Sequence, residues 1–421
     1  KNKTLLFYLT LLMILSQTRL AIAFVFLAIP LLIYLKLAKT QRDSLAFKKI
    51  FFLKLILVVG FISSLFHLLK YDFYFFGRDI MYFIQAPIFI TIGIYLPKNI
   101  INFKMLLKAI LLSSFVITIY NLIDLTLNPA LFFQLGLETR YEYNLSNSTA
   151  LLTFTILFYA RKFKFKLFKN SIEWLIISIS LFSVAISFSR TSYIILFVIL
   201  IIPMIGKYKN ILKIYWVTAF STLLIIFGGL FISVESNAID NSTFLSKMNH
   251  SLEEIIVKDY ETNFEIMNNW RGYEAFLGLS KFYEGNVFEI FFGQGFGTVV
   301  YTPSWIFGSE ENNLGVLPMF HNGFITILLK SGLAGLLFFF LFLYNLLKIT
   351  SKVMVRNFNK EFELTNKLLQ AAVFIILFKT LVVHGLFTKT SPILLLVMVG
   401  AIIRINTTKV ALLSRIKKNI L

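Results

Sequence analysis

Long apolar runs alternate with short polar segments along the whole chain. A run of roughly 20 apolar residues has the length that crosses the hydrocarbon core of a bilayer as a helix. Two lysines precede the first run, as in a signal peptide, but no small-residue cleavage site follows it, so we expect this span to be retained. The pattern predicts twelve membrane-spanning helices, at 4–17, 20–37, 50–69, 80–96, 105–123, 145–160, 172–188, 191–206, 214–233, 320–347, 368–384 and 391–405.

The predicted fold is therefore an all-α polytopic membrane protein with about twelve transmembrane helices and one large, mostly helical extracytoplasmic loop. Three parts are expected along the chain. Residues 1–233 form an N-terminal transmembrane bundle of about nine spans, residues 234–319 form the extracytoplasmic loop subdomain, and residues 320–421 form about three C-terminal spans.

Composition supports a membrane protein. Hydrophobic residues make up 57% of the chain and charged residues 15%, whereas soluble domains carry about 25% charged residues. The mean hydropathy is +0.78. The chain contains no cysteine, which excludes disulfides and thiolate metal sites.

The net charge of +20 is carried by short basic clusters between the apolar runs, such as 161–169 and 207–213. This pattern is typical of cytoplasmic loops. Placing the N-terminus in the cytoplasm puts most of the 41 Lys and Arg residues on that side, so we expect both termini there. Nucleic acid is not an expected partner, because no soluble element gathers the basic residues on one face.

The segment 234–319 differs from every other connection in length and charge. It holds twelve acidic residues and four basic ones. Loops of this length are usually functional or disordered. Its turn-forming residues and apolar spacing predict an ordered subdomain of short helices, with the best helix at 265–283.

Two arginines are candidates for binding an anion near the membrane plane. Arg190 lies between two predicted spans in SFSRTSY, where its near neighbours include Ser and Thr hydroxyls. The plain alternative is a loop arginine that extends to the interface. Arg271 precedes Glu274 by three residues, which places both on one face of a helix. For this pair the plain alternative is a surface ion pair that contributes little.

His321 and Asn322 stand at the mouth of the tenth predicted span, directly after the acidic loop. Histidine is the side chain that takes or gives a proton near neutral pH. Most lone histidines are structural, but His321 lies on the same predicted side as both arginines. The other three histidines, His67, His250 and His384, have no comparable neighbourhood in the sequence.

Lys330 lies inside the same predicted span, where a Lys-Ser-Gly break predicts a bend in the helix. It either contacts a phosphate or lines water. The stretch GQGFGT at 293–298 is similar to a phosphate-binding loop, but it lacks a GK[ST] ending and a strand–loop–helix setting, so we expect a turn. No HExxH, acidic metal-binding or GxSxG motif occurs, and we expect no metal site and no cofactor.

Four short motifs together resemble the O-antigen ligase and O-antigen polymerase superfamily of bacterial envelope glycosyltransferases. They are SRTSYI at 189–194, WRGYEAF at 270–276, FGQGFGT at 292–298 and HNGFITILLKSGLAG at 321–335. The resemblance lies in their order and spacing around one long late loop. It covers roughly 187–340, and the first half of the chain is similar only in hydropathy.

The resemblance implies a metal-independent, inverting glycosyltransferase of the bacterial cytoplasmic (inner) membrane, with its active site facing the periplasm. The donor is a glycan linked to undecaprenyl pyrophosphate. Arg190 and Arg271 then bind the pyrophosphate, and His321 is the base, with Glu274 as the competing base. Asn322 and Lys330 are secondary site candidates.

The acceptor separates two activities. It is a lipid-linked repeat unit for an O-antigen or surface-polysaccharide polymerase, and the sugar of a lipid A core for a ligase. RGYE and SRTSY look closer to polymerase members, so polymerase is the first expectation and ligase the alternative. Besides donor and acceptor, the expected partners are membrane lipids and a chain-length regulator protein.

Two non-enzymatic alternatives remain. A lipid-linked glycan transporter suits twelve spans, but transporters place polar residues at the midplane of broken helices, whereas the polar groups here gather at one face. A scaffold subunit of an envelope complex would not need His321 aligned with two arginines.

Overall fold

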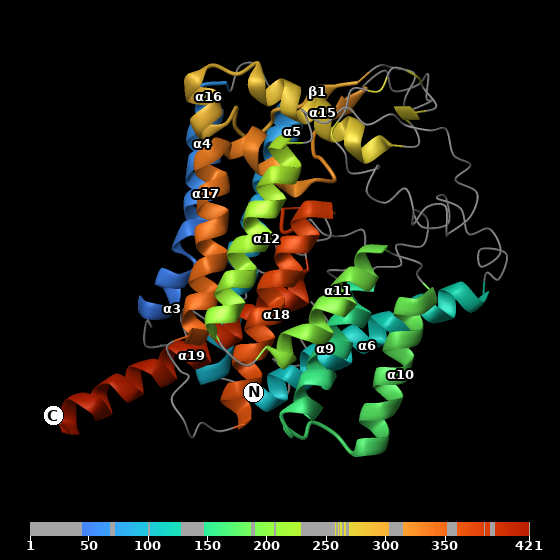
Figure 1. Ribbon diagram of the computed structural model, residues 1–421, viewed down its shortest axis with the longest axis vertical. Coiled ribbons are helices and arrows are strands. Elements are labelled where there is room, and N and C mark those ends of the chain that lie inside the picture. The colour runs from blue at the N-terminus through green and yellow to red at the C-terminus, as the bar shows by residue number, and fades with distance from the viewer. Residues whose placement is uncertain are drawn as a thin grey trace.

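The computed structural model of the protein is mostly helical (Figure 1). The predicted spans at 4–17 and 20–37 and His250 lie outside the described residues. The structure describes residues 44–67, 72–99, 102–127, 147–186, 190–205, 208–228, 257, 260, 262, 265–266, 269–302, 315–351, 360–382, 384–387 and 392–420.

Helices of the first half of the chain form the left edge, the centre and the lower right of Figure 1. Their bounds are α3 (Ser44–Lys49), α4 (Phe51–Leu65), α5 (Phe73–Asn99), α6 (Phe103–Leu127), α9 (Asn147–Lys162), α10 (Asn170–Ile186), α11 (Arg190–Ile201), the 3-10 turn η1 (Ile202–Met204) and α12 (Tyr208–Gly228).

In the second half of the chain, the described residues form three long helices and a small cap of short elements. The long helices are α17 (Gly323–Ser351), α18 (Lys360–Val382) and α19 (Ile393–Ile420). The cap consists of α15 (Trp270–Tyr283), α16 (Val287–Phe292), β1 (Val300–Tyr301) and β2 (Val316–Leu317). In Figure 1, α16 lies at the upper ends of α4 and α17, with α15 beside it.

Each predicted span that falls on described residues coincides with a helix. The largest difference is α19, which continues to Ile420, past its predicted end at 405. Polar and basic residues interrupt the apolar run after 405, but they do not end the helix. In the described part of the chain, four helices are long and apolar enough to cross a membrane, namely Phe73–Leu96, Phe103–Ile123, Gly323–Thr350 and Lys360–Val382. Shorter apolar helices occupy Phe51–Leu65, Asn170–Ile186, Thr191–Met204 and Ile393–Thr408.

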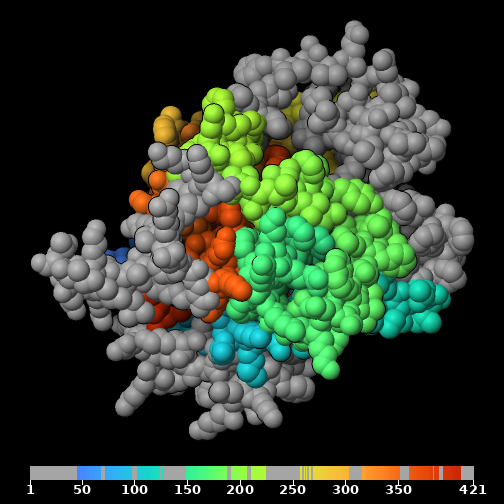
Figure 2. Space-filling view, turned by 60° about the horizontal axis from the view of Figure 1, so that its bottom comes forward, coloured from blue at the N-terminus to red at the C-terminus, as the bar shows by residue number. Residues whose placement is uncertain are grey.

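Large apolar side chains are exposed on several of these helices, including Trp174 and Phe182 on α10, Phe197 on α11 and Trp216 and Phe220 on α12. Figure 2 shows the broad face that α9, α10 and α11 form in green, beside the orange residues of the C-terminal half. Extended exposed apolar faces mark contact with a membrane or another protein. Together with the four long apolar helices, they indicate a membrane protein.

The helices α5 and α19 pack most closely where two glycines meet. A Cβ added to Gly93 would lie 2.2 Å from the carbonyl oxygen of Val397, and one added to Gly400 would lie 2.1 Å from that of Ile90. Small residues at a membrane-helix crossing let the two backbones approach and gain van der Waals contact. This crossing holds the C-terminal helix against the first half of the chain.

The described residues of the segment 234–319 include two short helices and a two-stranded antiparallel sheet. Val300 pairs with Leu317, and Tyr301 with Val316. The predicted helix at 265–283 is confirmed over α15. Tyr260, Ile266 and Tyr273 form a small apolar cluster beside it, so α15 is anchored on both faces.

Candidate active site

The Glu274 carboxylate joins α15 to the start of α17. Its Oε2 lies 2.6 Å from Nδ1 of His321, and its Oε1 accepts the backbone N–H of His321 at 3.0 Å. Glu274 is 2% exposed, whereas the side chain of His321 is 24% exposed. One buried carboxylate therefore fixes both the backbone and the ring of His321, and part of the ring remains accessible.

Close packing of α15 on α17 places Glu274 at this point. A Cβ at Gly278 would lie 2.5 Å from Cγ2 of Ile325 and 2.9 Å from the Phe320 ring. Because a larger residue would not fit without a shift, glycine allows the close approach. Glu274 and Gly278 are four residues apart and share a helix face, so the contact that brings α15 onto α17 also aims the carboxylate at His321.

Asn322 caps α17. Its Oδ1 accepts the backbone N–H of Phe324 at 3.0 Å, which satisfies one of the free donors at a helix start. On the other side of His321, the N–H of Phe320 donates to the Thr326 hydroxyl at 3.2 Å. These two bonds fix the backbone on both sides of His321.

The geometry assigns the protons of the His321 ring. A carboxylate only accepts hydrogen bonds, so Nδ1 carries the proton that faces Glu274. In the neutral imidazole Nε2 is then the unprotonated nitrogen. In many enzymes, a histidine base whose ring is oriented by a carboxylate activates a hydroxyl nucleophile.

His384 stacks on His321, with ring centroids 4.7 Å apart and an interplanar angle of 29°. Its backbone N–H donates to the carbonyl oxygen of His321 at 2.6 Å, and its Nδ1 lies 2.6 Å from the carbonyl oxygen of Phe320. The prediction that His384, unlike His321, has no candidate site residues near it is therefore wrong. Its position at the outer end of the predicted span 368–384, on the same predicted side as His321, was the signal that could have found it.

The loop after α18 holds His384 in an unusual conformation. His384 has φ of 40°, and Gly385 follows with φ of 65°. The pKa of His384 is lowered to about 4, first by burial and then by the neighbouring His321 and Arg271, whereas Glu274 and the hydrogen bond to Phe320 act to raise it. His384 is therefore neutral at physiological pH, and its Nδ1–H donates to the carbonyl oxygen of Phe320.

Arg271 belongs to the same cluster. It lies one turn before Glu274 on α15, is partly exposed, and is near enough to His384 to contribute to its lowered pKa. Glu274 is buried, so it is not the surface residue that the plain alternative assumed. Arg190 is the first residue of α11, and its side chain lies outside the described residues.

Lys330 forms a fully buried ion pair with Asp79 of α5. Its Nζ lies 2.5 Å from Oδ2 of Asp79, and the two side chains are 0% and 1% exposed. Lys330 also donates to the carbonyl oxygen of Thr298. Arg78 adds a bond of 3.2 Å to Oδ1 of Asp79. Asp79 was not among the predicted site residues, although an acidic residue beside an apolar run indicates a buried partner.

The Gly-rich stretch 293–298 is a turn, as predicted, and it enters the gap that a kink opens in α17. Gly332 has φ of 62° and ψ of −165°, which breaks the helix and confirms the predicted bend. The break leaves the carbonyl oxygen of Leu329 free for the N–H of Gln294, at 2.8 Å. A Cβ at Gly332 would lie 2.4 Å from the carbonyl oxygen of Phe291, so the contact requires glycine.

Further bonds tie this turn to the surrounding helices. Gly297 N–H donates to Oδ2 of Asp79 on α5 at 2.9 Å, and Phe296 N–H donates to the Ser64 hydroxyl on α4 at 2.6 Å. The Gln294 side-chain amide donates to the carbonyl oxygen of Lys281 at the end of α15 at 2.9 Å. The turn therefore connects α15, which carries Glu274, to α4, α5 and α17.

His67 also has a specific partner, which the sequence did not reveal. Its Nε2 lies 2.6 Å from Oε1 of Glu289, and its Nδ1 lies 3.0 Å from the carbonyl oxygen of Ser63. Glu289 in turn forms a capping box with Asn286 at the start of α16. This pair joins the end of α4 to the cap.

Within the described residues, no group of three or more His, Cys, Asp or Glu side chains is arranged to hold a metal ion. No protein-family model matches the chain, and no curated protein matches it at a significant level. The chemistry of the site therefore follows from its own geometry.

Lys330→Met should lower the free energy of unfolding by up to about 3–5 kcal/mol, because it leaves the buried Asp79 charge with Arg78 as its remaining ionic partner. The double variant Asp79→Asn/Lys330→Met should recover most of this loss, since both charges are then gone. Reversible chemical unfolding in detergent micelles measures these values.

Lys281→Met is the matched control, because Lys281 and Glu284 form an ion pair whose side chains are 40% and 65% exposed. It should change the free energy of unfolding by less than about 1 kcal/mol. Additive losses in the double variant would refute the pairing.

His384→Gln should make the protein less sensitive to acid. The folded-state pKa of His384, about 4, lies below its ordinary value of 6.5, so the unfolded state binds the proton first as pH falls. Stability should therefore be lost between pH 6.5 and 4, by up to about 3 kcal/mol, and be unaffected above pH 6.5. Unfolding of both proteins at pH 7.5 and 4.5 measures the difference. Equal acid sensitivity would show that His384 does not titrate as its burial requires.

Proposed function

We propose that this protein is an integral membrane glycosyltransferase. It transfers a glycan from an undecaprenyl pyrophosphate-linked donor to a sugar hydroxyl, as a polymerase of O-antigen or surface-polysaccharide repeat units. The observation that supports this proposal is the hydrogen bond between Glu274 and Nδ1 of His321, at 2.6 Å. It leaves Nε2 of a partly exposed imidazole as a base, with an arginine in the same cluster.

The proposed reaction is a single displacement. The acceptor hydroxyl gives its proton to Nε2 of His321 while its oxygen attacks the anomeric carbon of the donor. The bond from that carbon to the pyrophosphate oxygen breaks, and the lipid pyrophosphate leaves with the electron pair. Attack from the opposite side inverts the anomeric centre. Glu274 stabilises the imidazolium that forms and holds the ring in the reactive tautomer.

Positive charge beside the pyrophosphate stabilises the negative charge that develops on it as it leaves. Arginine presents a fork of N–H donors that matches phosphate oxygens and stays charged. Arg271 lies on α15 one turn from Glu274, so in this proposal it binds the pyrophosphate within reach of the base, with Arg190 as the second ligand. We assign no phosphate to Lys330, because its charge is already neutralised by Asp79.

The proposal places the site where an amphiphilic donor meets water. His321 directly precedes the candidate span Gly323–Thr350, so the prenyl chain would lie in the bilayer and the sugar outside it. We place the protein in the bacterial inner membrane with twelve spans, both termini in the cytoplasm, and the segment 234–319 on the periplasmic side.

His321→Ala should reduce the turnover of purified protein by about 10²–10⁴-fold, because general-base assistance typically contributes this much. Glu274→Gln should also lower turnover, since the amide favours the tautomer with the proton on Nε2. Neither change should greatly weaken donor binding, which rests on the arginines. The assay follows glycan transfer from a lipid-linked donor and, separately, the binding of that donor.

His67→Ala is the matched control, because it removes a histidine with an equally short carboxylate contact at another joint of the fold. Its turnover per folded molecule should match that of the wild type. An active His321→Ala variant with an inactive Glu274→Gln variant would move the base to Glu274. Product chains that lengthen with lipid-linked repeat units as the only acceptor indicate a polymerase, whereas product that forms only with lipid A core indicates a ligase. No transfer with either acceptor would refute the proposal.

A further inference from the structure

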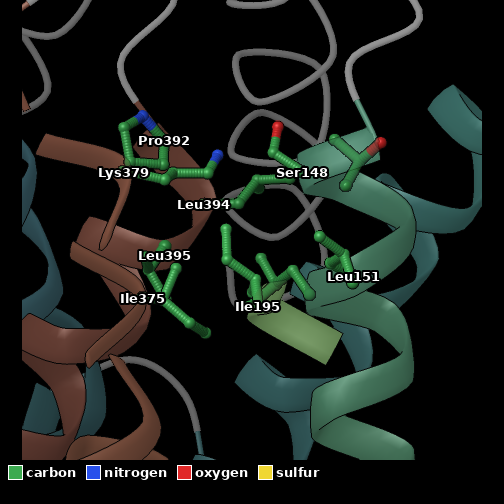
Figure 3. A pocket seen from close by; sticks show the side chains of 10 residues that line it. Ser148, Leu151, Ile195, Ile375, Lys379, Pro392, Leu394 and Leu395 are labelled. Atoms are coloured by element: carbon green, nitrogen blue, oxygen red, sulfur yellow. The ribbon is translucent and has the colours of Figure 1, made fainter. Parts of the chain in front are cut away.

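A small pocket, open on one side, lies between α9, α11, α18 and the start of α19. Most of its lining is aliphatic, with Leu151 from α9, Ile195 from α11 and Leu395 from α19. Lys379 of α18 extends across the pocket toward Ser148 at the start of α9 (Figure 3). The pocket therefore has one charged end and one apolar end.

Lys379 differs from Lys330 and Lys367, two buried lysines of α17 and α18. Lys330 pairs with Asp79, and Lys367 donates to the carbonyl oxygens of Ile202 and Ile205. Within the described residues, Lys379 has neither a carboxylate at ion-pair distance nor a hydrogen-bond acceptor. A charge inside a membrane helix is costly unless something neutralises it, so a lysine that faces a pocket and has no anionic partner among the described residues is a candidate for binding an anionic ligand.

The depth of Lys379 matches the boundary between lipid chains and headgroups. It lies in the last turn of the candidate span Lys360–Val382, and Figure 3 shows it at the same end of the pocket as Ser148 and Pro392. Ile375, Ile195 and Leu151 lie toward the opposite end. This is the order of a lipid, with a headgroup at the interface and a chain below it.

We propose that this pocket binds a phosphate-bearing membrane lipid. The headgroup phosphate accepts a charge-assisted hydrogen bond from Lys379, and the lipid chain lies along the aliphatic wall. A free phosphate ion would gain nothing from that wall, because pockets lined mostly by apolar side chains bind ligands with matching apolar surface. The inference does not depend on the glycosyltransferase assignment.

The plain alternative is a lysine that extends along its helix to reach water. Its direction argues against this alternative, since the side chain crosses the pocket toward α9 (Figure 3). The pocket also adjoins the candidate active site. The N–H of Gly385, the residue after His384, donates to the carbonyl oxygen of Lys379 at 3.2 Å, so the two sites share the end of α18.

The test uses the full chain, delipidated in a neutral detergent, and two lipids with the same acyl chains. Phosphatidic acid carries a phosphate and diacylglycerol does not. Polyprenyl phosphate and inorganic phosphate are the further probes. Binding is measured from the ligand-dependent rise in melting temperature. At least one of the two lipid phosphates should bind about tenfold or more tightly than diacylglycerol, as expected for one charge-assisted hydrogen bond.

Lys379→Met should abolish this preference, and Lys379→Arg should keep it. Lys367→Met is the matched control on the same helix and should also keep it. Ile195→Trp fills the apolar end without changing any charge and should weaken the binding of lipid phosphates, which keeps the test decisive if Lys379→Met does not fold. An unchanged preference in Lys379→Met, or unchanged binding of the lipid phosphates in Ile195→Trp, would overturn the proposal. So would inorganic phosphate that binds as tightly as the lipid phosphates, because the ligand would then be a soluble anion.

Discussion

Lys330 and Asp79 lie inside apolar helices, where an unpaired charge would cost several kcal/mol. Each neutralises the other at 2.5 Å. Arg78 donates to the other carboxylate oxygen of Asp79, and the backbone of the turn 293–298 bonds to the pair through Gly297 and Thr298. This constraint determines where the turn lies, because moving it away would leave buried polar groups without partners.

The geometry of the candidate active site follows from this constraint. The turn inserts at the kink of α17 and also bonds to the end of α15 through Gln294. With both helices attached to the same turn, the contact at Gly278 brings Glu274 to His321. The histidine is thus oriented by a hydrogen bond that depends on a buried ion pair elsewhere in the bundle. A single charge change at Asp79 would affect stability and the alignment of the base together.

Local patterns in the sequence were enough to predict the helices, the bend near Lys330 and the turn at 293–298. Apolar runs, a Lys-Ser-Gly break and a Gly-rich stretch are each contained in a few adjacent residues. The contacts that build the site are not local. Glu274 and His321 are 47 residues apart, and Gly297 and Asp79 are 218 apart, so no spacing rule joins them. Glu274 is therefore predicted from the sequence as a base that competes with His321, whereas the structure shows it as the hydrogen-bond partner of His321. His384 is a different case. The predicted topology already placed it on the side of His321, so the sequence held information that pointed to it.

The central claim is that Glu274 holds His321 with its proton on Nδ1 and leaves Nε2 as the base. The direct measurement is ¹⁵N NMR of the histidine-labelled protein in a lipid bilayer at mildly alkaline pH, where only four histidines contribute. The signals of His321 are assigned by their loss in His321→Gln. The account predicts a protonated Nδ1 and an unprotonated Nε2 in the wild type, and a shift of the proton to Nε2 in Glu274→Gln. A wild-type His321 that carries its proton on Nε2 would contradict the account.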